Sequence, residues 1–142
     1  MKIRLPQELA PLFLRLGVGF VFFMFGIDKF KQPEFWLEFM NKQLLFYLPM
    51  SPTTFIYLLG GLETIVGFLL IIGLYTRIAA AIAALNLIGI IVQLGINDAT
   101  IRDVGLLAAA LSLVVTGSRW LSIDSRFNLD QKKKKQEYIQ LG

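Results

Sequence analysis

The stretch TFIYLLGGLETIVGFLLIIGL, Thr54 to Leu74, decides the fold class. It is apolar almost throughout, and Glu63 is its one charged residue. Its length matches the ~20 residues that a helix needs to cross a ~30 Å hydrocarbon core, and it lacks the alternation of apolar and polar residues that is typical of a strand. Because only helices and closed barrels satisfy their backbone in lipid, we predict a transmembrane helix here.

Three other stretches have the same character. Together with the first they predict four transmembrane helices, at about residues 9–26, 54–74, 78–96 and 103–121. The composition agrees, because only 17% of the 142 residues are charged, whereas roughly 25% is usual in soluble domains. We expect an all-α membrane protein, with residues 1–127 as a single four-helix domain and residues 128–142 as a basic, flexible tail.

The distribution of charge predicts the topology. With four spans, the two termini and the turn between spans two and three share one side, and this side carries an excess of positive residues: Lys2, Arg4, Arg77, Arg119, Arg126 and Lys132 to Lys135. On the other side, Lys29, Lys31, Lys42 and Arg102 are balanced by Asp28, Glu34, Glu38, Asp98 and Asp103. The positive-inside rule places both termini in the cytoplasm of a prokaryotic cell, with the spans in its plasma (inner) membrane.

The net charge of +4 is therefore a topology signal and indicates no nucleic-acid partner. The basic tail can contact anionic membrane lipids.

The predicted outer segment, residues 31–52, contains a second kind of pattern. Pro33 and Glu34 are typical of a helix start. Apolar and aromatic residues then recur at roughly helical spacing: Trp36, Phe39, Met40, Leu44 and Tyr47. This predicts a short amphipathic helix on the outer leaflet. The alternative is a lid over a cavity in the bundle.

The chain contains no Cys and no His. Disulfide and thiol chemistry are excluded, and no haem, zinc or other metal site of the usual kind is expected. Any redox chemistry would therefore depend on a bound cofactor or on a partner protein.

Two ionisable residues lie well inside the predicted spans, Arg15 in the first and Glu63 in the second. Ionisable groups in a bilayer are costly unless they are paired. Counted from the cytoplasmic ends at ~1.5 Å per residue, Arg15 lies ~9 Å deep and Glu63 ~16 Å deep. Because an arginine side chain can bridge that difference, we predict an Arg15–Glu63 ion pair. Lys29 and Asp103, at the outer ends of their helices, are predicted to form a second pair.

Gly19 shares a helical stripe with Arg15, and Gly67 shares one with Glu63. Asn86 and Gln93 lie on a stripe of small and polar residues in the third span. Small residues let helices approach closely, and polar residues hydrogen-bond between helices. One interpretation is structural, with the buried charges fixing the register of the helices. The other is functional: the stripes line a small-molecule site whose ligand-binding residues are Arg15, Glu63, Asn86, Gln93, Gly19 and Gly67. Glu63 is then the catalytic, proton-exchanging group.

The order of features along the chain resembles the DoxX-like family (DoxX/DoxD type) of small four-helix membrane proteins. The resemblance rests on LRLGVGFVFFMFGIDKF (residues 14–30), ETIVGFLLIIGLYTR (63–77) and DVGLLAAALSLVVTGSRWLSID (103–124). The family includes the quinone-linked small subunit of an archaeal thiosulfate oxidation system and a bacterial subunit of a membrane redox complex. The resemblance therefore implies an oxidoreductase-associated role, with a quinone as the cofactor.

Three functions follow as hypotheses. The first is a redox-complex subunit that binds a quinone-like or lipid-like ligand and acts with a redox or soluble cytoplasmic partner, which Arg77 and Asp124 contact unless they pair with each other. The second is a non-enzymatic membrane scaffold or assembly protein whose buried charges are structural. A small-molecule carrier is the third, and it is disfavoured because no predicted span is broken by proline.

Overall fold

The computed structural model describes residues 9–117 and 123. The helices within these residues are α1 (Leu9–Lys31), α2 (Pro33–Glu38), α3 (Lys42–Tyr47), α4 (Pro52–Ile72), α5 (Thr76–Leu94) and α6 (Asp98–Thr116), and these residues contain no strand. α1, α4, α5 and α6 are long and apolar enough to cross a membrane. The prediction of an all-helical chain with four spans is confirmed.

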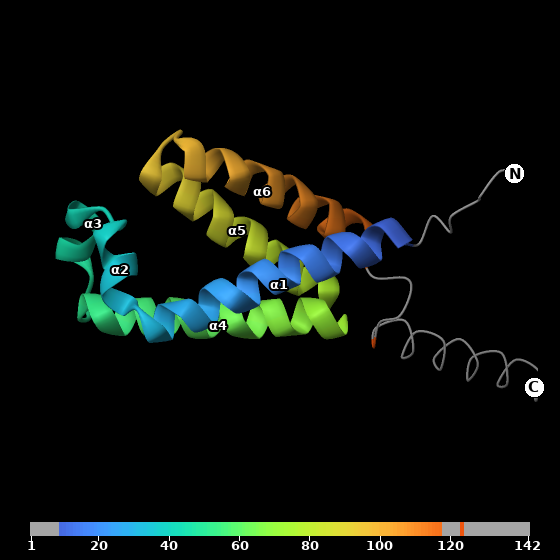
Figure 1. The fold of residues 1–142 in the computed structure, drawn as a ribbon, viewed down its shortest axis with the longest axis horizontal. Helices are drawn as coiled ribbons and strands as arrows, with labels where there is room; N and C mark the ends of the chain where they lie inside the picture. The colour runs from blue at the N-terminus through green and yellow to red at the C-terminus, as the bar shows by residue number, and fades with distance from the viewer. Residues whose placement is uncertain (1–8, 118–122, 124–142) are drawn as a thin grey trace, which may run out of the picture.

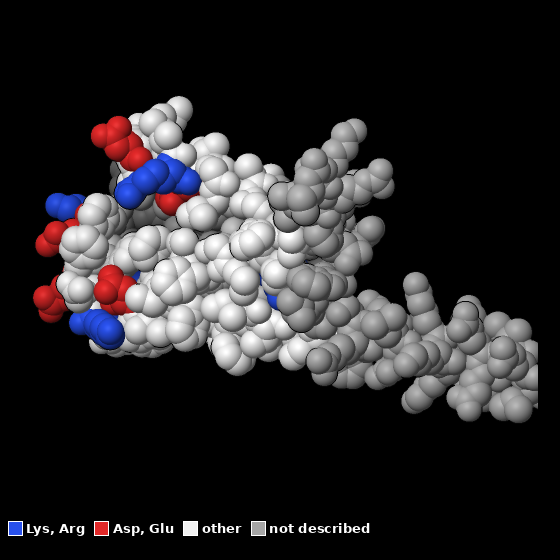
Figure 2. All heavy atoms as spheres, turned by 45° about the vertical axis from the view of Figure 1, so that its right-hand side comes forward, with Lys and Arg blue, Asp and Glu red and all other residues white. Residues whose placement is uncertain are grey.

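The four long helices form two antiparallel pairs (Figure 1). α1 packs along α4, and α5 packs along α6. The short helices α2 and α3 lie at one end of the bundle, which we call the α2–α3 end. The turn at Gly73, between α4 and α5, lies at the opposite end, together with the first residues of α1 and the last of α6 (Figure 1). Figure 2 shows charged side chains gathered at the α2–α3 end, while most of the described surface in that view is uncharged.

Local signals place the ends of the helices. α4 begins where the Ser51 hydroxyl caps the Thr54 N–H, and it ends at Gly73, whose φ of 71° is left-handed. α6 begins at Asp98, earlier than the expected start near Asp103, because Asn97 forms a capping box with Thr100. α1 continues to Lys31 rather than ending at residue 26, so Lys29 belongs to the helix.

Glycines fix how α1 and α4 cross. A Cβ added at Gly67 would lie 2.7 Å from the carbonyl oxygen of Gly19, and one at Gly60 would lie 2.9 Å from that of Gly26. Both distances are too short for a real Cβ, so these positions allow the two backbones to touch. Each helix carries its two glycines seven residues apart, which in antiparallel helices sets one register along the whole contact.

The outer segment differs from the single interfacial helix predicted for it. It forms two short helices, α2 and α3, because the chain breaks after α2 and Asn41 caps α3 by accepting a hydrogen bond from Gln43 N–H. On α3, Phe46 and Tyr47 are 82% and 81% exposed. α2 instead packs on α1 and α4.

Candidate functional site

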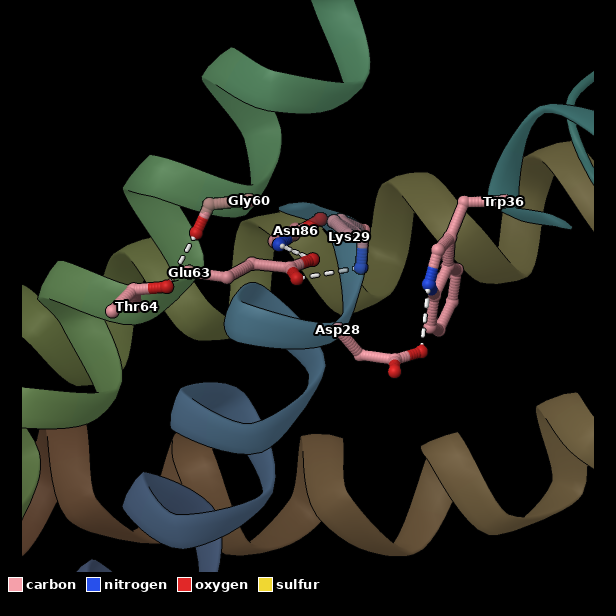
Figure 3. Close-up of polar contacts among 7 residues, drawn as sticks. All are labelled: Asp28, Lys29, Trp36, Gly60, Glu63, Thr64 and Asn86. Carbon is pink, nitrogen blue, oxygen red and sulfur yellow. Dashed lines mark hydrogen bonds and ion pairs between the residues drawn. The ribbon is translucent and has the colours of Figure 1, made fainter. Parts of the chain in front are cut away.

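Three helices meet at one buried carboxylate. Lys29 of α1 donates from Nζ to Glu63 Oε2 at 2.6 Å, and Asn86 of α5 donates from Nδ2 to Glu63 Oε1 at 2.9 Å (Figure 3). Lys29 and Glu63 are both 3% exposed. Both oxygens of Glu63 are thus engaged, as a charged group removed from water requires. We call these residues the Lys29–Glu63–Asn86 cluster.

The helix register explains why Lys29 is placed to reach Glu63. A Cβ at Gly60 would lie 2.9 Å from Lys29 Cβ, so the base of the lysine side chain lies against this glycine. Glu63 is one helical turn further along α4. The long lysine side chain spans this turn and brings its ammonium to the carboxylate.

The predicted Arg15–Glu63 ion pair is wrong, because Glu63 pairs with Lys29 instead. With Gly19 opposite Gly67 in antiparallel helices, Arg15 lies at the level of residue 71 of α4, about eight residues or ~12 Å along the helix from Glu63. That distance exceeds what the two side chains can span. Arg15 is itself buried, at 2% exposure, but towards the other end of the bundle.

The predicted Lys29–Asp103 pair is also replaced, because Lys29–Glu63 is the one salt bridge within residues 9–117. α1 contacts α4 far more extensively than α6, and the pairs α1–α4 and α5–α6 diverge towards the α2–α3 end (Figure 1). Lys29 therefore pairs with Glu63 on α4, the helix nearer to α1, and not with Asp103 on α6. Asp103 lies in the wall of a cavity that Lys29 also lines.

Arg77, predicted to contact Asp124 or a partner, has a described contact within the bundle. Its Nη2 donates to the carbonyl oxygen of Val115 at 3.3 Å, which joins the start of α5 to the end of α6. Asp124 lies outside the described residues, so its predicted pairing with Arg77 stays a prediction.

A cavity of about 460 Å³ lies next to the Lys29–Glu63–Asn86 cluster, at the α2–α3 end of the bundle. Figure 2 shows a hollow beside the charged side chains of that end. The lining is mostly apolar, with rings and aliphatic side chains from all four long helices and from α2. Its polar members are few: Lys29, Glu63, Gln93, Arg102 and Asp103. An apolar cavity of this size with a few polar groups is typical of a site for a small organic ligand.

The structure separates the residues predicted to bind a ligand. Glu63 and Gln93 line the cavity. Asn86 is not part of the lining and is hydrogen-bonded to Glu63. Gly19 and Gly67 are packed against α4 and α1 respectively, where they form the helix contact.

Sequence reasoning missed four lining residues as members of a ligand site. The sequence predicts Trp36 in an interfacial helix, with a lid over a cavity as the alternative, and it predicts Lys29 and Asp103 as a structural pair. Arg102 carried no signal, because a charged residue near a helix end is ordinary in any membrane protein. The signal that could have identified Lys29 is its place one turn beyond Gly26 on the stripe of α1 that faces α4.

Comparison with known proteins identifies the family of this chain. The model of the DoxX family matches residues 10–95. The chain belongs to the DoxX family. A protein of Bacillus subtilis (strain 168) named "Putative oxidoreductase CatD" is 33% identical over 121 residues, which cover 82% of this chain and 86% of the relative. No solved structure matches the chain. The DoxX match contains the whole Lys29–Glu63–Asn86 cluster and ends before Arg102 and Asp103.

Proposed function

We propose that this DoxX protein is a subunit of a membrane redox complex and that it binds a quinone-like ligand in the cavity at the α2–α3 end. The observation that carries the proposal is the placement of a buried, hydrogen-bonded ion pair, Lys29–Glu63, in the wall of a mostly apolar cavity. The membership of the DoxX family and the name of the Bacillus subtilis relative support a link to oxidoreductases.

The lining fits the ligand class. A quinone has an apolar ring with two carbonyl oxygens, and Phe22, Phe25 and Trp36 supply ring surface at the same cavity wall as Lys29. An ammonium has three N–H donors, and one of those of Lys29 is engaged by Glu63. A further donor can therefore bond to a ligand carbonyl oxygen, while the volume of about 460 Å³ accepts the ring and not a whole membrane lipid.

When bound, a quinone supplies two-electron, two-proton chemistry. The chain has no Cys or His, so the electrons belong to a partner protein that carries its own redox centre. The role left to the described residues is proton exchange and orientation. Glu63 accepts or returns a proton at Oε2, Lys29 holds that oxygen in place, and Asn86 holds the other oxygen.

The test is quinone-dependent activity in membranes that contain the partner protein. We expect the variant Glu63→Gln to retain the side-chain volume and to lose at least about tenfold in activity, because general acid–base groups typically contribute ~10²–10⁴-fold. Gln93→Glu, combined with Glu63→Gln, places a carboxylate at another lining position. This double variant is the charge control, and we expect it not to restore the activity that Glu63→Gln loses. Full activity of Glu63→Gln would remove the proposed role of the carboxylate.

A second function, an assembly scaffold, has one observation in its favour. The Lys29–Glu63–Asn86 cluster joins α1, α4 and α5, which is what a purely structural cluster would do. The two functions differ in whether ligand binding is lost when the ion pair is replaced by apolar residues.

The proposal includes an orientation in a prokaryotic plasma membrane, with the α2–α3 end outside and both termini in the cytoplasm. The chain has no Cys, so a single introduced cysteine reports its side without background. We expect a membrane-impermeant maleimide to label Phe46→Cys on intact cells, because Phe46 is 82% exposed on α3. Lys132→Cys should react only after the cells are permeabilised. The reverse pattern would contradict the positive-inside assignment.

A further inference from the structure

Trp36 of α2 lies directly over the ion pair. Its indole ring is 3.8 Å, measured to the ring centroid, from Lys29 Nζ, and the ring lines the cavity. Its Nε1–H donates to Asp28 Oδ2 at 3.0 Å (Figure 3). The cavity wall on this side also contains side chains from α2 and from the residues that follow it, namely Phe35, Phe39 and Met40. We call these residues and Trp36 the cover of the cavity.

A single ammonium therefore contacts both the buried carboxylate and the cover of the cavity. Lys29 Nζ is bonded to Glu63 Oε2 on one side and faces the Trp36 ring on the other. A cation over an indole face is attracted by the negative face of the ring, and the attraction is strongest where water is excluded. Displacement of α2 would remove this contact from Lys29 and leave the ammonium with its carboxylate partner alone.

Few interactions hold α2 in this position. It has six residues, and its N-cap, Gln32, makes no side-chain capping bond. Helices this short are not stable by themselves. The described polar bond from α2 to a long helix is Trp36–Asp28, and Phe25 adds an edge-to-face ring contact with Trp36 at 5.7 Å between centroids. Beside the packing of α2 on α1 and α4, the polar contact that places the Trp36 ring over Lys29 is therefore made by one side chain.

We propose that Trp36 is the gate residue over the buried Lys29–Glu63 pair and that its hydrogen bond to Asp28 holds this gate closed. A ligand reaches the Lys29–Glu63 pair when the Trp36–Asp28 hydrogen bond breaks and the indole leaves the ammonium. The gate rests on the proposed function in one respect only, namely that a small ligand enters this cavity.

Access to the buried side of the cavity, where the Lys29–Glu63 pair lies, can be measured without any ligand. Ile56 is 1% exposed and lines the cavity, so Ile56→Cys places the only thiol of the chain beneath α2. We expect methyl methanethiosulfonate to modify this thiol about tenfold faster in the Asp28→Ala background, the size expected from loss of one hydrogen bond to a charged acceptor. Phe46→Cys on exposed α3 is the matched control, whose rate should not change.

A second substitution removes the same bond from the other side. Trp36→Phe keeps a ring over Lys29 and lacks the N–H donor, so it should accelerate the labelling of Ile56→Cys to a similar extent. The double variant Asp28→Ala/Trp36→Phe should be no faster than Asp28→Ala alone, because the Trp36–Asp28 bond can be lost only once. Asp28→Ala also removes the bond from Gln32 Nε2 at 3.4 Å, so its effect should equal or exceed that of Trp36→Phe, but the double variant should not multiply the two effects. Unchanged rates in both variants, or rates that multiply in the double variant, would overturn the gate.

Binding of 1,4-naphthoquinone separates this inference from the proposed function. Trp36 and Trp120 are the two tryptophans, so Trp120→Phe leaves Trp36 fluorescence as the reporter. In that background, Asp28→Ala should raise the association and dissociation rates of the probe together. If the thiol rates respond and the probe does not bind, the gate stands and the quinone proposal fails. If the probe binds with rates that Asp28→Ala leaves unchanged, the quinone site stands and the gate fails.

Discussion

Replacement of Glu63 by leucine is expected to lower the free energy of unfolding by about 3–5 kcal/mol, the cost typical of removing one partner from a buried ion pair. Lys29 is 3% exposed and loses its carboxylate, while Asn86 loses the acceptor of its amide. The loss should appear as a lower midpoint of thermal unfolding in detergent micelles. Glu34→Gln on exposed α2 is the control and should melt like the unmodified protein.

The double variant Lys29→Leu/Glu63→Leu is expected to recover most of this loss. Replacing both members of a buried pair by apolar residues of similar volume is often neutral or stabilising, and Trp36 and Ile56 offer apolar surroundings at the cavity wall. A double variant that melts as low as Glu63→Leu would show that the ion pair does not act as a unit.

The same double variant decides between a redox subunit and a scaffold. If the pair is structural only, the stable double variant should assemble normally and bind 1,4-naphthoquinone as the unmodified protein does. If Lys29 and Glu63 form the polar end of a ligand site, binding should fall by at least about tenfold, the loss expected when hydrogen bonds to charged groups are removed. The proposed function requires the second result.

The four spans were predictable because hydropathy depends on each segment alone. A stretch such as residues 54–74 must be a helix in lipid whatever its neighbours do. Glu63 and Asn86 could be chosen as polar residues inside the spans for the same reason, since few polar groups occur there.

The partner of Glu63 could not be predicted in this way, because it depends on the register between two helices. A depth count from the ends of the spans placed Arg15 near Glu63, whereas the glycine contacts shift α1 along α4 and bring Lys29 there instead. The sequence leaves two roles open for Trp36, an interfacial anchor and part of a lid over a cavity, because both need the same aromatic pattern. Only the path of the chain at Lys31 turns Trp36 towards Lys29.

Gly67→Leu is expected to prevent α1 and α4 from packing, with a loss of stability larger than the ~1–3 kcal/mol typical of an overpacked core. Even a single Cβ at Gly67 would lie 2.7 Å from Gly19 O and 2.8 Å from Phe23 Cα. These are backbone atoms, so no side-chain rotation relieves the clash and the two helices must separate. We expect aggregation or a strongly lowered thermal midpoint in detergent, and the milder Gly67→Ala should fall between this variant and the unmodified protein.

Gly89→Leu is the matched control, because no atom lies within 4 Å of a Cβ built at Gly89 on α5. It adds the same apolar volume to a membrane-spanning helix and should leave the midpoint unchanged or higher, since glycine is a poor helix former. Equal losses in the two variants would mean that the helix contact is not set at Gly67. Because this contact also sets the register of Lys29 and Glu63, the surviving fraction of Gly67→Ala should bind 1,4-naphthoquinone more weakly, whereas Gly89→Leu should bind it normally.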